Sequence, residues 1–171
     1  FPIFDAQARA VGFGGRILPG SDDPAKYKNS AESSVYAKSR VLYGLNWAKT
    51  NVVESDEVIV CEGYTDVIGF FQAGVPRAVA TCGTALTDDH VKLLRKFARR
   101  VVLSFDADSA GQNAAARFYE WEKSYDLDVA VADLPDGADP GELAQNDPER
   151  LRAAITDAKP FLAFRVGRVL D

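Results

Sequence analysis

The stretch VIVCEGYTD, residues 58–66, decides the fold of this chain, and two later stretches repeat its pattern. VVLSFDAD follows at residues 101–108, and VAVADLPDGADP follows at residues 129–140. Each begins with an apolar run that is rich in β-branched residues and lacks polar alternation, which is typical of a strand buried on both faces. Acidic residues then lie at or just beyond the end of each predicted strand. Ligands bind at that edge of an open parallel sheet, so the spacing predicts an α/β fold with a functional site there.

From residue 57 onward, strand-like and helix-like segments alternate. Gly74 and Pro76 end a predicted helix over residues 65–73, and Thr87 is suited to cap another helix over residues 88–98. Repeated strand–helix–strand units predict a mostly parallel sheet with right-handed crossovers. Further elements are expected as strands over residues 57–61, 78–81, 101–105 and 127–132, a helix over 109–124, and helical segments over 140–170 that are interrupted at Pro148 and Pro160.

The N-terminal part has a different pattern. Residues 1–4 and 8–13 predict short strands, and the glycines at 12–15 predict a hairpin turn. A loop rich in Pro, Gly, Ser, Asp and Asn is expected over residues 19–34, followed by a helix over residues 39–50.

The composition is that of a globular protein. Of 171 residues, 47% are hydrophobic and 26% are charged, which excludes a disordered chain. No apolar run approaches the ~20 residues of a membrane-spanning helix, and no signal-peptide pattern opens the sequence. Two cysteines, Cys61 and Cys82, provide no disulfide framework, which is typical of a reducing cytoplasm. The sequence opens at Phe1 in strand-like residues and contains no methionine, so we expect it to be a piece of a longer protein.

The charge is unevenly distributed. Residues 1–40 contain six basic and four acidic residues, a net charge of +2, whereas the other 131 residues contain 14 basic and 21 acidic residues, a net charge of −7. A basic N-terminal part beside an acidic metal site is compatible with a polyanionic partner. The total of −5 fits an ordinary acidic protein equally well.

The acidic residues after two of the strands form a candidate metal site. Glu62 is suited to act as a general base or metal ligand, and Asp106 and Asp108 are spaced to bind one cation or to bridge two. Gathered carboxylates repel one another unless cations neutralise them, and their hard oxygen atoms suit Mg²⁺ or Mn²⁺. Such ions serve phosphate chemistry, often in pairs about 3.5–4 Å apart. Asp66 lies one helical turn after Glu62 and can support the site from outside the ligand set. The alternative is that these acids cap helices, which suits Asp66 and Asp108 better than Glu62.

Several motifs resemble those of one protein family. Glu62-Gly63-Tyr64-Thr65-Asp66 together with Asp106-Ala107-Asp108 resembles the Toprim domain, which bacterial primases, topoisomerases and some nucleases share. Flanking motifs resemble the RNA polymerase core of the bacterial DnaG-type primases, namely GFGGR (12–16), KYKNS (26–30), LYGL (42–45) and LPDGADP (134–140).

The resemblance implies a Toprim fold in which helices flank a mostly parallel sheet. It implies three parts in this chain. Residues 1–52 would be the C-terminal part of the basic N-terminal subdomain, which is mixed α/β. Residues 53–137 would be the Toprim catalytic domain. Residues 138–171 would complete the metal site and begin a helical subdomain.

The resemblance also implies DNA-dependent synthesis of RNA primers by metal-assisted nucleotidyl transfer, in the cytoplasm of a bacterium during DNA replication. The partners would be a single-stranded DNA template, nucleoside triphosphates, the RNA primer, a replicative helicase bound through a region absent from this chain, and inhibitory alarmones of the guanosine tetraphosphate type. Carried over by motif, the metal site would comprise Glu62, Asp106, Asp108 and Asp139. The groove for phosphates and nucleic acid would comprise Arg16, Lys26, Tyr27, Asn29 and Lys38. Arginine and lysine suit phosphate, tyrosine can stack on a base, and asparagine can hydrogen-bond a sugar or base.

The sequence departs from the family pattern at one site position. The family often has a second acid two residues after the aspartate of the Asp-Pro pair, where this chain has Gly141, followed by Glu142. Two cysteines and one histidine cannot form the family's zinc module, so we expect little priming from the chain alone. His90, early in its predicted helix, is expected at the surface.

Two other functions remain open from the residues. One is a different Toprim reaction, strand cleavage by a nuclease or a topoisomerase. The other is a receiver-like binding module, which also has acids at strand ends and accepts a phosphoryl group on aspartate.

Overall fold

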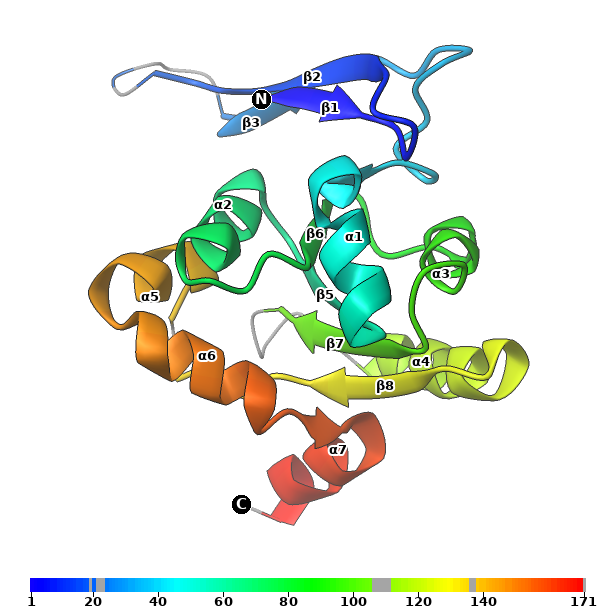
Figure 1. The fold of residues 1–171 in the computed structure, drawn as a ribbon, viewed down its shortest axis with the longest axis vertical. Helices are drawn as coiled ribbons and strands as arrows, with labels where there is room; N and C mark the ends of the chain where they lie inside the picture. Colours follow the sequence, from blue (N-terminus) through cyan, green and yellow to red (C-terminus); the bar gives the residue numbers. More distant parts are fainter. Residues whose placement is uncertain (19, 21–23, 106–111, 136–137, 171) are drawn as a thin grey trace.

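The buried apolar runs form a six-stranded sheet. Its strands are β4 (Leu42–Tyr43), β5 (Glu57–Cys61), β6 (Ala78–Thr81), β7 (Arg100–Ser104), β8 (Asp128–Val131) and β9 (Lys159–Pro160). They lie in the order β4-β6-β5-β7-β8-β9. The four central strands are parallel (Figure 1). β4 and β9 pair antiparallel at the two edges. The computed structural model describes residues 1–18, 20, 24–105, 112–135 and 138–170.

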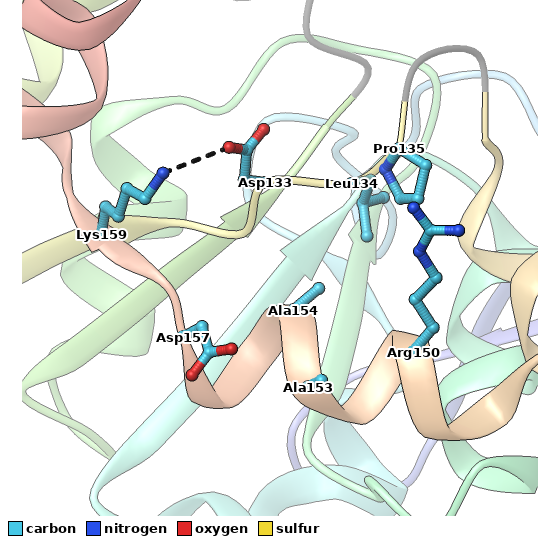
Figure 2. A pocket seen from close by; sticks show the side chains of 8 residues that line it. All are labelled: Asp133, Leu134, Pro135, Arg150, Ala153, Ala154, Asp157 and Lys159. Atoms are coloured by element: carbon cyan, nitrogen blue, oxygen red, sulfur yellow. Dashed lines mark hydrogen bonds and ion pairs between the residues drawn. The ribbon is translucent and has the colours of Figure 1, made fainter.

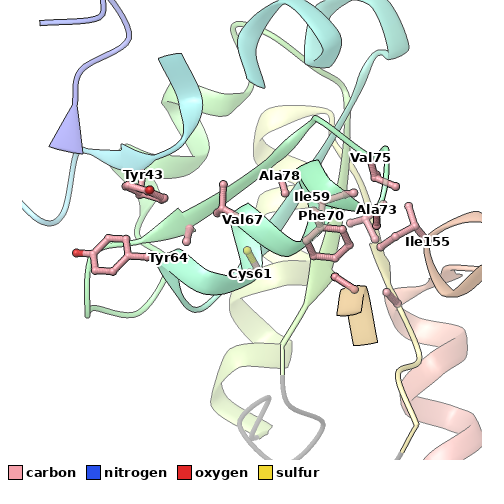
Figure 3. Packing of buried hydrophobic residues seen from close by; sticks show 14 of the residues in the cluster. Tyr43, Ile59, Cys61, Tyr64, Val67, Phe70, Ala73, Val75, Ala78 and Ile155 are labelled. Carbon is pink, nitrogen blue, oxygen red and sulfur yellow. The ribbon is translucent and has the colours of Figure 1, made fainter. Parts of the chain in front are cut away.

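Helices cover both faces of this sheet. They are α1 (Leu45–Ser55), α2 (Tyr64–Gln72), α3 (Asp88–Leu94), α4 (Gln112–Tyr125), α5 (Pro140–Asn146), α6 (Pro148–Thr156) and α7 (Phe161–Leu170). Because successive strand residues point to opposite faces, Ile59 (Figure 3) and Val102 pack with α2, α5 and α6. Val58 and Val101 pack with α1, α3, α4 and α7 on the other face. The predicted α/β class, with helices around a mostly parallel sheet, is confirmed.

The N-terminal residues form a separate antiparallel sheet of β1 (Pro2–Phe4), β2 (Ala10–Arg16) and β3 (Tyr27–Asn29). The prediction of a hairpin turn at residues 12–15 was wrong, because these glycines lie inside β2. Gly14 is required there by a close approach: a Cβ atom on it would lie 2.5–2.6 Å from atoms of the Tyr64 ring and hydroxyl.

The helix predicted over residues 39–50 is displaced along the chain. Leu42 and Tyr43 pair with β6 instead, and Gly44, with φ of 85°, turns the chain into α1. The interruptions predicted near Pro148 and Pro160 are confirmed, since Pro148 begins α6 and Pro160 lies in β9 immediately before α7.

The strand ends determine where a site can form. Cys61 and Ser104, the last residues of β5 and β7, are paired in register, so the segments that follow them leave the same edge of the sheet. The N-terminal sheet also reaches this edge, because Asn29 of β3 donates a hydrogen bond to the carbonyl oxygen of Cys82, just beyond β6. Within the described residues, no helix combines the length and apolar character needed to cross a bilayer.

Candidate metal and nucleotide site

Three acidic side chains lie near the carboxyl edge of the main sheet. Glu62 directly follows β5 and is exposed. Asp66 lies in the first turn of α2, is buried, and its Oδ2 accepts a hydrogen bond of 2.8 Å from the backbone N–H of Gly63. Asp139 caps α5, and its Oδ1 accepts hydrogen bonds from the backbone N–H groups of Gly141 (2.7 Å) and Glu142 (3.1 Å). Helix N-termini thus hold two of the three carboxylates in place.

The electrostatics show that these acids are neighbours. The pKa of Asp66 is raised to about 6. Burial is the main cause, the hydrogen bond from the Gly63 N–H opposes the rise, and the negative charges of Asp139 and Glu62 add to it. Carboxylates that disfavour one another's charge in this way are stabilised by a cation. The oxygen atoms available are of the kind that Mg²⁺ and Mn²⁺ bind, so the residues fit such an ion.

Asp106 and Asp108, the predicted metal-binding pair, lie outside the described residues. Within the described part of the chain, no group of three His, Cys, Asp or Glu side chains is close enough to hold a metal ion. A complete site therefore requires ligands beyond Glu62 and Asp139.

The structure gives a reason for glycine at position 141. A Cβ atom there would lie 3.0 Å from Asp139 Oδ1 and 3.3 Å from the carbonyl oxygen of Thr65. A Cβ atom on Gly69 of α2 would lie 2.9 Å from the Cα atom of Gly141. Two facing glycines thus let α2 and α5 approach closely, which holds Asp139 next to the helix that carries Asp66. Glu142 is exposed in the first turn of α5.

Four of the predicted phosphate and nucleic-acid residues lie on the N-terminal sheet or its loops. Arg16 and Tyr27 are opposite one another in the β2–β3 pair, with the Arg16 guanidinium 5.8 Å from the ring centroid of Tyr27. This geometry permits a cation–π contact and leaves an exposed arginine beside an aromatic face. Lys26 is exposed next to Tyr27. Lys38 is half-buried, and its charge partly offsets the rise that burial causes in the pKa of the Cys82 thiol.

Asn29 is the fifth such residue, and both polar atoms of its side-chain amide form hydrogen bonds within the protein. Its Nδ2 donates to the Cys82 carbonyl oxygen at 2.8 Å, and its Oδ1 accepts a hydrogen bond from the Tyr64 hydroxyl. A backbone carbonyl can only accept, so the amide nitrogen must face Cys82 and the amide oxygen must face Tyr64.

Tyr64 is the residue that the sequence analysis missed. It is buried between the two sheets, where Phe1 stacks on its ring at 5.0 Å and Tyr43 meets it edge-on at 4.6 Å. Figure 3 shows Tyr43 and Tyr64 close together at one end of the core. The available signal was its position between Glu62 and Asp66 in a motif otherwise interpreted only through its acids.

The expectation of a surface position for His90 was wrong. His90 is fully buried, its Nδ1 accepts from the Thr87 backbone N–H at 3.2 Å, and its Nε2 lies 2.9 Å from the Lys38 carbonyl oxygen. Nε2 must therefore carry the proton, and burial lowers the pKa of the ring. His90 connects α3 to the loop that carries Lys38.

A groove of about 550 Å³ lies apart from these residues, between Asp133–Pro135, α6 and Lys159 (Figure 2). Asp133 and Lys159, which both line it, form an ion pair of 3.4 Å. The groove is lined, within the described residues, by none of the predicted site residues.

Two family comparisons cover most of the chain. The Toprim-like family matches residues 59–144, and the family described as the N-terminal domain of the DNA primase catalytic core matches residues 1–49. The chain belongs to the DnaG-type primase family. The predicted Toprim fold is confirmed with it.

Other DnaG-type primases align along nearly the whole chain. The DNA primase of Clostridium acetobutylicum is 40% identical over 172 residues, which covers 100% of this chain and 28% of that protein. The RNA polymerase domain of Mycobacterium tuberculosis DnaG, bound to double-stranded DNA with a six-nucleotide overhang, has 35% identity and a TM-score of 0.86 over 96% of this chain and 54% of that one. A DnaG catalytic domain bound to single-stranded DNA has 39% identity and a TM-score of 0.84, and the match covers 99% of this chain and 54% of that one. The chain thus spans under a third of the curated relative.

Proposed function

We propose that the protein containing this chain synthesises RNA primers on a DNA template during replication. The observation that carries the proposal is the position of Glu62, Asp66 and Asp139 at one edge of a Toprim-like sheet, with the Arg16–Tyr27 pair on the strands that pack against that edge. Metal-binding acids and phosphate-binding cations on adjoining surfaces are what nucleotidyl transfer requires. The boundaries proposed for the three parts are residues 1–52, 53–137 and 138–171.

Each group of residues has a separate task in this proposal. Glu62, Asp139, Asp106 and Asp108 would hold Mg²⁺ or Mn²⁺, and Asp66 would support them from the buried side. A bound ion would supply charge neutralisation at the phosphates. Arg16, Lys26 and Lys38 would bind the triphosphate and the template backbone, and Tyr27 would stack on a base.

The reaction is an in-line displacement. The primer 3′-hydroxyl attacks the α-phosphorus of the incoming nucleotide, a phosphodiester bond forms, and pyrophosphate leaves. Glu62 is exposed at the strand end and is suited to accept the hydroxyl proton. The helix-terminal N–H groups that hold Asp66 and Asp139 fix their carboxylates before substrate arrives.

The proposed partners follow from the same residues. They are a single-stranded DNA template, nucleoside triphosphates and the growing RNA primer, with a replicative helicase bound outside this chain, in the bacterial cytoplasm. An alarmone of the guanosine tetraphosphate type would compete at the triphosphate site. Absence of competition between that alarmone and nucleotides would remove this partner from the proposal.

Primer synthesis by the full-length protein tests the function. The Asp106→Ala, Asp108→Ala double variant and the Asp139→Asn variant should lose primer synthesis, while Glu54→Gln, a surface acid of α1, should retain it. Wild-type rates in the double variant would refute the proposal. Metal-dependent cleavage of DNA without added nucleotides would favour a nuclease or topoisomerase instead. Stable phosphorylation by acetyl phosphate would favour a receiver-like module.

A further inference from the structure

The Asn29 bridge connects the two halves of the proposed site. The bridge consists of the Asn29 amide with its hydrogen bonds to the Tyr64 hydroxyl and the Cys82 carbonyl oxygen. Asn29 ends β3, the strand that also contains Tyr27. Tyr64 begins α2, two residues after Glu62. A single side chain thus joins the strand proposed to bind nucleotide to the turn proposed to bind metal.

The surroundings make this bridge stiff. The Tyr64 ring occupies the space that a side chain on Gly14 would fill, and Gly14 is the residue opposite Asn29 in the β2–β3 pair. Phe1 stacks on one face of the ring, and Tyr43 contacts it edge-on. The ring therefore cannot slide along β2 or rotate away, and its hydroxyl is aimed at Asn29.

The bridge also reaches the turn after β6. Gly83 follows Cys82 with φ of 72°, and a Cβ atom on it would lie 3.0 Å from Asn29 Nδ2. The Cys82–Gly83 turn is thus shaped around the asparagine amide, with a glycine where the backbone passes closest. Three segments from different parts of the sequence meet on one amide group.

We propose that Tyr64 and Asn29 are positioning residues, which hold the nucleotide-binding strand β3 in a fixed position relative to the metal-binding turn after β5. Neither polar atom of the Asn29 amide needs to touch the substrate for this role. The inference rests on the proposed function and assigns to Tyr64 a task that its neighbours Glu62 and Asp66 do not perform. Catalysis is sensitive to such alignment because a displacement of about 1 Å can reduce a rate by about a hundredfold.

Tyr64→Phe in the full-length primase is the sharpest test, because it removes the hydroxyl and keeps the ring that packs against Gly14. We expect kcat for primer extension to fall about tenfold or more, with KM for nucleotide changed less than about threefold, since Lys26 and Tyr27 remain in place. Asn29→Ala removes both hydrogen bonds and should reduce kcat at least as much. The double variant should be no worse than Asn29→Ala alone, because the two residues act as one unit.

Tyr36→Phe is the matched control. Tyr36 is buried in the same core, and its hydroxyl lies beside the Cys82 thiol and makes no part of the Asn29 bridge. The same chemical change there should leave kcat and KM unaltered. Thermal unfolding of all variants separates alignment from stability: Tyr64→Phe should unfold within a few degrees of the wild type while its kcat is reduced.

The outcomes distinguish this inference from its rivals. If Asn29 instead binds nucleotide directly, Asn29→Ala raises KM strongly, and Tyr64→Phe lowers activity further in the Asn29→Ala background. Wild-type kinetics in Tyr64→Phe, or a kcat loss that only matches a loss of folded protein, would overturn the positioning role. The Asp106→Ala, Asp108→Ala variant assayed alongside tests the proposed function separately, because neither substitution changes a residue of the bridge.

Discussion

Gly14→Ala tests the close packing between the two sheets. The added Cβ atom would lie 2.5–2.6 Å from Tyr64 atoms, well inside normal contact. The ring cannot retreat, because Phe1 lies on it at 5.0 Å and Tyr43 at 4.6 Å. Overpacking of this kind costs about 1–3 kcal/mol. For a chain of this size each kcal/mol lowers Tm by about 2–4 °C, so Gly14→Ala should lower Tm by about 2–12 °C.

Gly15→Ala is the matched control in the same strand. Its nearest neighbour to an added Cβ atom is the Lys28 carbonyl oxygen at 3.8 Å, an ordinary contact. Replacing glycine without strain stabilises a protein by about 0.4–1 kcal/mol, because the unfolded chain loses freedom. Thermal unfolding followed by circular dichroism should therefore place the two variants on opposite sides of the wild type. A Gly14→Ala protein that unfolds at or above the temperature of Gly15→Ala would refute the reasoning.

Three further changes test other parts of the structure. Asp66→Asn should stabilise the metal-free protein at pH 8 by about 1–3 kcal/mol, because burial holds the pKa of this carboxyl at about 6 and its charged form is disfavoured. This gain in stability should vanish as the pH falls from 6 toward 4. Denaturant unfolding measured at several pH values would contradict the prediction if the gain were constant. His90 has a lowered pKa, so its contribution to stability is complete above about pH 6.5 and is lost below that pH, by at most about 1.4 kcal/mol per pH unit. The stability of His90→Gln should lack this pH-dependent loss. Identical pH profiles of unfolding for the variant and the wild type would refute the prediction. Gly69→Ala should destabilise the protein by about 1–3 kcal/mol and weaken Mn²⁺ binding measured by calorimetry, because its Cβ atom would push Gly141 and the neighbouring Asp139 away from α2. An unchanged Tm and an unchanged Mn²⁺ affinity would contradict this role for the facing glycines.

The main sheet could be predicted from the sequence because its signals are local. The strand over residues 78–81 matches β6, and the helix over residues 65–73 differs from α2 by one residue at each end. Unbroken runs of β-branched residues, and a glycine with a proline after the helix, determine these elements without reference to distant residues.

The errors arose where distant residues decide the structure. Glycines at 12–15 predict a turn by their local preference, yet Gly14 lies within a strand because the Tyr64 ring requires its space. His90 carries a polar ring on a predicted surface helix, but its partner is a carbonyl oxygen 52 residues away. No local pattern contains either contact.

The candidate site was predictable only in part, for the same reason. The order of the acids along the chain indicates the edge at which they gather, and Asp66 and Asp139 are close enough for one charge to act on the other. The pairing of Asn29 with Tyr64 and Cys82 joins residues 35 and 53 positions apart, so it becomes visible only in three dimensions.

The two edges of the main sheet have a consequence for the behaviour of the protein in solution. β4 and β9 are each two residues long and pair antiparallel with β6 and β8, the strands that they cover, and β9 contains Pro160, which has no N–H to donate. A long, flat edge would offer a template on which other chains could add strands and form fibrils. These short caps leave little backbone for such addition. The chain should therefore resist aggregation through its sheet even at the concentrations used for structural work.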